Sequence, residues 1–146
     1  MNWFKQKDIL VPYDFSEESK SAIEVALELA EKQSDIHVLH VMYELTVTDP
    51  GVIWHSIDDE KRRENVIGEF TEKTADLELK DVHFEVGIGD PGAVIAEKAE
   101  EIDAGMIVIP SHGRTGLTRL MLGSVAERVV RLAKCPVLVL KKQRER

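Results

Sequence analysis

One cysteine and no long apolar run set the first limits on this chain of 146 residues. Cys135 has no second cysteine to pair with, so an internal disulfide is excluded, which suits a reducing compartment. No segment approaches the roughly 20 apolar residues that cross a membrane. The opening residues 1–7 are too short and polar to contain the apolar centre of a signal peptide. We therefore expect a cytoplasmic protein.

Several catalytic and metal-binding motifs are also missing. The sequence has no G-x-x-x-x-G-K-[ST] phosphate loop, no serine in a G-x-S-x-G turn and no H-E-x-x-H pair. Paired Cys and His ligands do not occur. His37 and His40 lie three apart on an expected strand, so their side chains point to opposite faces. The sequence predicts neither catalytic residues nor a metal site built from side chains.

Basic residues are in the minority, with 19 Lys and Arg against 27 Asp and Glu, a formal net charge of -8 and a pI of about 5.1. Because the summed field repels polyanions, nucleic acid and anionic membranes are excluded as main partners. With 43% hydrophobic residues, a chain of this length can bury one adequate core. We expect a single domain spanning residues 1–146.

Short apolar runs alternate with segments of helical period along the whole chain. The expected strands are 9–13, 36–42, 82–88, 106–109 and 136–141. The first expected helix begins after Asp14 or Ser16 and ends at about residue 32, and the other helices are expected at about 58–79, 91–103 and 123–133. This alternation is typical of an α/β fold with one five-stranded, mainly parallel sheet and packed helices. Polar residues alternate with apolar ones in 82–88, which indicates a sheet edge.

Local signals predict how these helices begin and end. Asp14 and Ser16 are both candidate N-caps for the first helix, and Asp90-Pro91 caps the helix that Gly105 closes. Ser124 is the expected N-cap of the last helix. The second helix is expected to hold four residues towards the core: Val66, Phe70, Ala75 and Leu77. The irregular segment from Tyr43 to Ile57 is interpreted as a flap.

The most informative stretch runs from Met106 to Glu127, where a buried strand gives way to a basic, glycine-bearing loop and then to an amphipathic helix. Gly113 and Gly116 allow the backbone to approach a ligand, and Gly123-Ser124 stands where the unpaired amides of the next helix begin. These donors, the helix dipole and Arg114 all favour a phosphate. The alternative is an ordinary surface loop with a solvated arginine.

A second glycine motif, Gly87-Ile-Gly-Asp-Pro-Gly92, matches the dinucleotide pattern G-x-G-x-x-G between a strand and a helix. That pattern normally opens the first strand-helix-strand unit and is followed by an acidic residue after the next strand. Here it comes third, and the next strand ends in Pro110-Ser-His112. We interpret it as the start of a capped helix.

These residues resemble the universal stress protein family across nearly the whole chain. ATP-binding members carry G-x2-G-x9-G-[ST] after the fourth strand, and here the matching positions read Pro110-Ser-His-Gly113, nine residues, then Gly123-Ser124. Three of the four defining positions match, and a proline replaces the first glycine. The opening 9–14 with Ser16 is similar to the family's first strand and its acidic residue. The closing run that follows Cys135 is similar to its last strand.

The resemblance implies an open sheet with strand order 3-2-1-4-5, helices on both faces and a Rossmann-like fold of the adenine nucleotide alpha hydrolase type. It implies ATP, AMP or ADP as ligand, with a divalent ion such as Mg²⁺ and no catalysis beyond slow hydrolysis. Pro110 removes one backbone N–H from the phosphate loop, which implies weaker binding. The implied site residues are Pro12, Tyr13, Asp14, Val41, Pro110, Gly113, Arg114, Gly116, Gly123, Ser124 and Val125.

The resemblance also implies a homodimer formed through the last strand, Val137, Leu138, Val139 and Leu140. An unpaired edge strand of this apolarity gives a physical reason for pairing with a second copy. Three functions are compatible with the same residues. The first is an adenine-nucleotide-binding regulatory protein of the stress response, and the main alternative is a nucleotide-free dimeric interaction module with a vestigial phosphate loop. An ATPase or phosphotransferase that depends on Asp14 or Ser124 ranks last, because the sequence offers no evident base.

Overall fold

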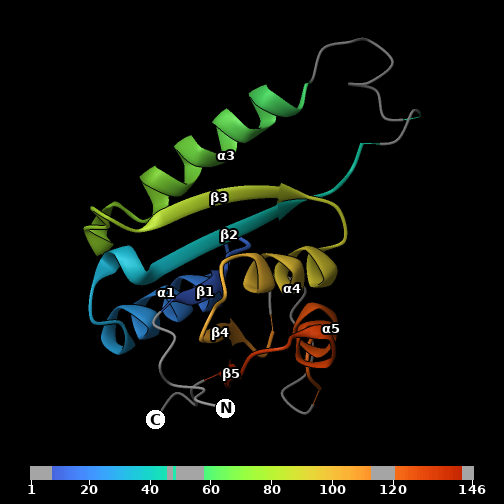
Figure 1. Ribbon diagram of the computed structural model, residues 1–146. Coiled ribbons are helices and arrows are strands. Elements are labelled where there is room, and N and C mark those ends of the chain that lie inside the picture. Colours follow the sequence, from blue (N-terminus) through green and yellow to red (C-terminus); the bar gives the residue numbers. More distant parts are fainter. Residues whose placement is uncertain (1–7, 46–47, 49–57, 113–120, 143–146) are drawn as a thin grey trace.

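The computed structural model describes residues 8–45, 48, 58–112 and 121–142. Five parallel strands form one open sheet in the order β3-β2-β1-β4-β5 (Figure 1). The strands are β1 (Ile9–Pro12), β2 (Ile36–Met42), β3 (His83–Ile88), β4 (Met106–Pro110) and β5 (Val137–Leu140). The predicted fold class and strand order are thus confirmed.

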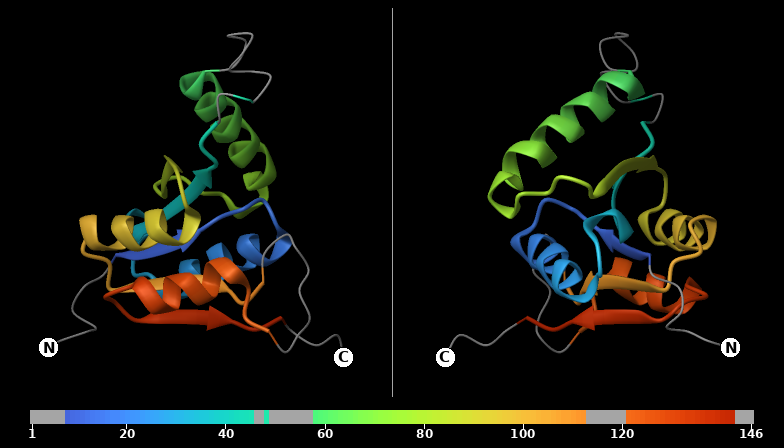
Figure 2. Two further views of the ribbon diagram at one scale, coloured as in Figure 1. Left: turned by 90° about the vertical axis from the view of Figure 1, so that its right-hand side faces the viewer. Right: turned by 60° about the vertical axis from the view of Figure 1, so that its left-hand side comes forward.

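Helices cover both faces of the sheet. In the described part of the chain they are α1 (Glu17–Leu29), α3 (Asp59–Lys73), α4 (Pro91–Glu101) and α5 (Ser124–Leu132). Short 3₁₀ turns precede two of the strands, η1 (Gln33–Asp35) before β2 and η2 (Ala75–Leu77) before β3. Figure 2 shows α4 and α5 on one face and α1 and α3 on the other. The parallel connections require this arrangement, because each crossover from one strand to the next carries a helix over the sheet.

The central strands are apolar on both faces, so the protein has two core clusters. On the α1 and α3 face, Val11, Val38 and Val108 pack with Ile23 and Phe70. On the α4 and α5 face the cluster is built from Leu10, Leu39, Ile95, Ile107, Ile109, Ala126 and Val129. Alternate residues of one strand enter different clusters, as the two-residue period of a strand requires.

The helix caps differ in part from those expected. Ser16, not Asp14, is the N-cap of α1, because its side chain accepts a hydrogen bond from the Ser19 amide. Asp90 caps α4 as predicted, with Pro91 as the first helical residue. The left-handed residue after α4 is Asp103, at φ 51°, so the expectation that Gly105 closes this helix is wrong. Aspartate tolerates that conformation better than most residues do.

Helix α3 is shorter than predicted. It ends at Lys73, and the chain tightens into η2, which replaces the expected helical continuation to residue 79. Phe70 is buried, and Val66 and Leu77 are half-buried, but Ala75 is exposed, so its placement in the core is wrong. The change from 3.6 to 3 residues per turn at Thr74 shifts the following side chains out of the α3 register.

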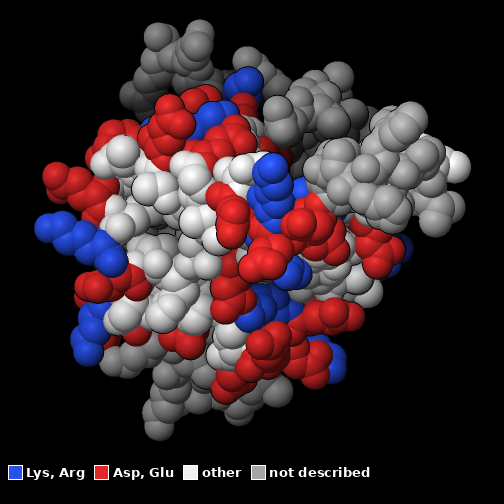
Figure 3. Space-filling model, turned by 90° about the horizontal axis from the view of Figure 1, so that it is seen from above, with Lys and Arg blue, Asp and Glu red and all other residues white. Residues whose placement is uncertain are grey.

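The two edge strands differ in character. Strand β3 lies at one edge, as its alternation predicted, and exposes His83 and Glu85, whereas β5 at the other edge is entirely apolar. Figure 3, seen from above, shows acidic and basic side chains side by side, with no continuous basic patch among the residues described there. Within the described ranges, no helix is long and apolar enough to cross a membrane.

Candidate functional site

A cavity of about 280 Å³ opens at the carboxyl ends of β1, β2 and β4. Strand β1 lies between β2 and β4, so the connections leave it in opposite directions and a crevice forms where they part. We call this space the crest cavity. Its walls come from β1 and its extension, from the end of β2, from β4 and from the starts of α4 and α5. The described lining residues are Pro12, Tyr13, Asp14, Ser19, Leu39, His40, Val41, Tyr43, Pro91, Ile95, Ile109, Pro110, Ser111, Gly123, Ser124, Val125 and Ala126.

Asp14 stands at one wall, in a turn that fixes its carboxylate. The Asp14 Oδ1 atom accepts hydrogen bonds from the Ser16 amide at 3.0 Å and the Ser16 hydroxyl at 2.5 Å. Between them, Phe15 adopts φ 67°, a conformation that costs energy for a bulky residue. Ring contacts with Tyr13 and His40, both at 4.9 Å between centroids, hold Phe15 there. The strained turn places Asp14 beside the cavity while Ser16 caps α1.

The start of α5 forms another part of the cavity wall. Gly123 is its N-cap and Ser124 its first helical residue, so the expectation that Ser124 is the N-cap is wrong. The Gly123 amide donates to the Ser111 carbonyl at 2.7 Å. A Cβ atom at residue 123 would lie 3.0 Å from that carbonyl oxygen, which explains why glycine occupies this close approach.

The first turn of α5 leaves backbone donors beside the cavity. Its first helical hydrogen bond joins the Glu127 amide to the Gly123 carbonyl at 2.8 Å, and Gly123 supplies no side-chain cap. The amides of residues 124–126 come before Glu127 in the helix, so no carbonyl of α5 accepts a hydrogen bond from them. Gly123, Ser124, Val125 and Ala126 all line the crest cavity. This is the arrangement in which a helix N-terminus favours an anion.

The floor of the cavity is apolar and rigid. Leu39 and Ile109 are each 3% exposed, and Ile95 reaches the cavity from α4. The Tyr13 ring packs edge-on against Phe70 at 5.3 Å, and burial, with nearby acidic groups, raises the pKa of Tyr13. The His40 Nδ1 atom lies 2.8 Å from the Tyr13 carbonyl oxygen. Such a surface suits a flat apolar group more than a second charge.

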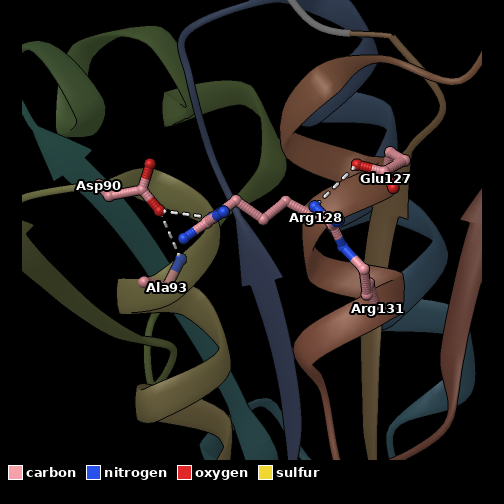
Figure 4. Close-up of polar contacts among 5 residues, drawn as sticks. All are labelled: Asp90, Ala93, Glu127, Arg128 and Arg131. Carbon is pink, nitrogen blue, oxygen red and sulfur yellow. Dashed lines mark hydrogen bonds and ion pairs between the residues drawn. The ribbon is translucent and has the colours of Figure 1, made fainter.

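An ion pair joins the N-cap of α4, Asp90, to the middle of α5, at Arg128. Figure 4 shows the Asp90 carboxylate between the Ala93 amide, which donates at 3.0 Å, and the Arg128 Nε atom at 2.8 Å. These contacts hold the pKa of Asp90 below its ordinary value, the backbone bond from Ala93 being the larger cause. The stem of Arg128 crosses Gly92, where an added Cβ would lie 2.6 Å from it. The glycine motif at 87–92 is thus the start of helix α4, as predicted, and the Asp90 carboxylate occupies the N-cap position there.

Eight of the eleven predicted site residues meet around the crest cavity: Pro12, Tyr13, Asp14, Val41, Pro110, Gly123, Ser124 and Val125. Gly113, Arg114 and Gly116 lie outside the described residues, as does most of the segment interpreted as a flap. Sequence reasoning missed Ser111, Tyr43 and Ile95. Ser111 directly follows β4, Tyr43 directly follows β2, and Ile95 lies one helical turn after Pro91, so their positions after strand ends and on α4 were the available signals.

A larger hollow of about 520 Å³ lies between α1 and the end of β5 and shares Pro110 and Ser111 with the crest cavity. Three carboxylates from α1 line it, those of Glu18, Glu24 and Glu28, and so do two lysines, Lys141 and Lys142. The charged side chains of this hollow are therefore of both signs, with the negative sign in slight excess. The crest cavity differs in that the first turn of α5 lines it.

One polar side chain that lines the crest cavity, that of Ser111, has a histidine beside it. The Ser111 hydroxyl lies 3.1 Å from His112 Nδ1, and no carboxylate orients that imidazole in the described part of the chain. Nor do the described residues contain three His, Cys, Asp or Glu side chains that could hold a metal together. The described walls of the crest cavity thus combine apolar side chains, the first turn of a helix and one carboxylate, at the edge of an open α/β sheet.

The chain belongs to the universal stress protein family. The model of that family matches residues 6–141. The universal stress protein YxiE of Bacillus subtilis is 35% identical over 144 residues, covering 91% of this chain and 97% of that protein. The universal stress protein MJ0531 of Methanocaldococcus jannaschii is 55% identical over 51 residues, or 35% of this chain, which span only 30% of that relative's length.

Solved structures agree with this assignment. The structure of hypothetical protein MJ0577 superposes with a TM-score of 0.74 at 28% identity, covering 96% of this chain and 99% of that one. A universal stress protein in complex with cAMP superposes with a TM-score of 0.61 at 18% identity, over 92% of this chain and 96% of that one. At that identity the second likeness shows the shared fold.

Proposed function

We propose that this protein binds an adenine nucleotide, ATP or its AMP and ADP relatives, in the crest cavity and acts as a regulatory protein of the stress response. One observation carries the proposal: the first turn of α5, with its unpaired amides, and Asp14 line one and the same largely apolar cavity. The amides suit the phosphates, the carboxylate suits the ribose hydroxyls, and the apolar walls suit the base. The cAMP complex of a protein with this fold supports the same ligand class.

In this proposal Pro12, Tyr13 and Val41 border the base and ribose, and Gly123, Ser124 and Val125 hold the phosphates. Gly113, Arg114 and Gly116 complete the phosphate loop, and Pro110 shapes its start. A Mg²⁺ ion would enter on the phosphates, because Asp14 is the one carboxylate among the described lining residues and already accepts two hydrogen bonds from Ser16. Occupancy then changes which partner the protein binds, and hydrolysis is slow or absent.

The test is a calorimetric titration of ATP with magnesium into the wild type and two variants of the exposed Ser124. Ser124→Glu puts a negative charge into the first turn of α5. The helix dipole stabilises that charge, whereas a bound phosphate is repelled by it. Ser124→Gln has the same shape without the charge. We expect Ser124→Glu to weaken ATP binding at least tenfold relative to Ser124→Gln, with no loss of thermal stability. Equal affinities would place the phosphates elsewhere.

We further propose a homodimer through β5. Directly after β4, the Ser111 amide donates to the Leu140 carbonyl at 2.8 Å, so Leu138 and Leu140 turn their backbone groups towards β4. Val137 and Val139 accordingly turn theirs towards the open edge. Val139→Pro removes an outward N–H and spares the β4 ladder, whereas Val139→Thr keeps that N–H. Sedimentation is expected to give dimers for the wild type and Val139→Thr, and monomers for Val139→Pro. Monomeric wild type contradicts the proposal.

The second candidate, a nucleotide-free interaction module, is favoured by Pro110, which lies at the position of the first loop glycine and has no N–H to offer a phosphate. The same titration separates the two functions. If wild-type protein that is folded and dimeric takes up no ATP, AMP or ADP, the module is the correct function and the crest cavity is a remnant.

A further inference from the structure

Three aromatic rings line the described walls of the crest cavity, and two of them are already engaged. Tyr13 is 3% exposed, and its ring packs against Phe15 and Phe70. His40 packs against Phe15 and lies in hydrogen-bond contact with the Tyr13 carbonyl. The third ring, that of Tyr43, is 76% exposed, and the described part of the chain offers it no ring partner.

The backbone of Tyr43 is nevertheless held firmly. The Arg62 Nη2 atom donates to the Tyr43 carbonyl oxygen at 2.9 Å, and Arg62 Nη1 pairs with Asp59 at 3.1 Å in the first turn of α3. Only 19% of the Arg62 side chain is exposed. The start of α3 therefore anchors the residue that follows β2, and an exposed aromatic ring on an anchored backbone is a preformed contact surface.

Two residues at the carboxyl end of β2 offer surfaces for a flat ring. Val41 lies in the strand and Tyr43 directly follows it, and both line the crest cavity. A planar group that packs on such a side chain makes carbon contacts at about 3.5 Å. A purine base is such a planar group and presents a π face to an aromatic ring.

We propose that Tyr43 stacks on the purine base of the bound nucleotide, and that Arg62 is a positioning residue that holds Tyr43 over the cavity. The proposal rests on the proposed nucleotide-binding function and adds to it the source of affinity for the base. The helix amides of α5 would hold the phosphates of any nucleotide or of free polyphosphate, whereas a stacking ring raises the affinity only for a ligand that has a base.

The experiment compares wild type with Tyr43→Phe, which keeps the aromatic face, and Tyr43→Leu, which keeps only apolar bulk. One readout is ATP affinity by calorimetry. The other is the fluorescence of a 2-aminopurine nucleotide at saturating protein, which a stacked aromatic ring quenches. We expect Tyr43→Phe to bind within about twofold of wild type, and Tyr43→Leu to bind about 5-fold to 100-fold more weakly, with the quenching lost.

Three results would overturn the inference. The first is Tyr43→Leu with wild-type affinity. The second is Tyr43→Leu with weak affinity but wild-type quenching of the bound probe, which would mean that the residue acts through structure alone. The third is Arg62→Gln with unchanged affinity and quenching, which removes the positioning role. If the wild type binds no nucleotide, both the proposed function and this inference are wrong. That result is distinct from the other three, in which the wild type still binds ATP.

Discussion

Replacing Gly92 with alanine is expected to destabilise the protein, although alanine is normally the better helix residue. A Cβ atom at residue 92 would lie 2.6 Å from both Arg128 Cγ and Cδ and 2.9 Å from Arg128 Cβ. Real Cβ atoms do not approach carbon so closely, so α4 must move away from α5 or Arg128 must leave Asp90. Overpacking of this kind costs about 1–3 kcal/mol, against a helix gain of about 0.5–1 kcal/mol.

Gly68 provides the matched control, because it lies within α3 and a Cβ atom there meets nothing within 4 Å. Gly68→Ala should therefore stabilise the protein by about 0.5–1 kcal/mol. Urea unfolding of both variants gives the comparison. We expect opposite signs, with Gly92→Ala lowering the free energy of unfolding by about 1 kcal/mol or more.

The same change in an Arg128→Ala background identifies the cause. Without Cγ and Cδ only the 2.9 Å contact remains, so Gly92→Ala should cost less there than in the wild type. The double-mutant cycle removes the contribution of the Asp90–Arg128 pair itself. If Gly92→Ala stabilises as much as Gly68→Ala, or costs the same with and without Arg128, the packing of α4 on α5 described above is wrong.

Two further predictions concern the imidazoles of the sheet and the strained turn. His37 stacks on His83 at 4.6 Å with Asp8, Glu85 and Lys98 around it, and burial followed by the charge of His83 lowers the pKa of His37. The unfolded chain then binds protons more readily than the folded one, so stability should fall as the pH drops below about 6.5. Urea midpoints from pH 8 to pH 5 should show this decline, and His37→Gln should flatten it; an equally steep decline in that variant would contradict the assignment. At Phe15, φ 67° favours glycine, so Phe15→Gly should be about 1 kcal/mol more stable than Phe15→Ala in thermal unfolding, and the reverse order would refute strain at this turn.

Much of the fold was predictable because its signals are local or periodic. The strands at 36–42 and 137–140 are short apolar runs. The start of α4 is likewise a local signal, because Asp90 followed by Pro91 predicts a helix N-terminus from the immediate sequence alone. The errors arose where two local solutions compete. Asp14 and Ser16 both suit an N-cap, and only the turn at Phe15 decides that Ser16 takes that place. Likewise Asp103, rather than a glycine, adopts the left-handed conformation after α4.

The candidate site was predictable to the extent that strand ends and a helix start define it. Residues such as Asp14 and Ser124 follow directly from that rule, and the structure places them at one cavity. Tyr43, the His37–His83 stack and the Gly92–Arg128 contact were not predictable, because each depends on which strands or helices become neighbours. Strand order and register, not composition, bring these pairs together.

The most direct test of the central claim is a heteronuclear NMR titration of the wild-type protein with ATP. The account predicts the largest amide shifts at Asp14, Val41, Ser111 and residues 124–126, with inorganic tripolyphosphate moving the α5 amides alone. Shifts confined to the hollow between α1 and β5, or no shifts at millimolar ATP, would contradict the claim that the crest cavity is a nucleotide site.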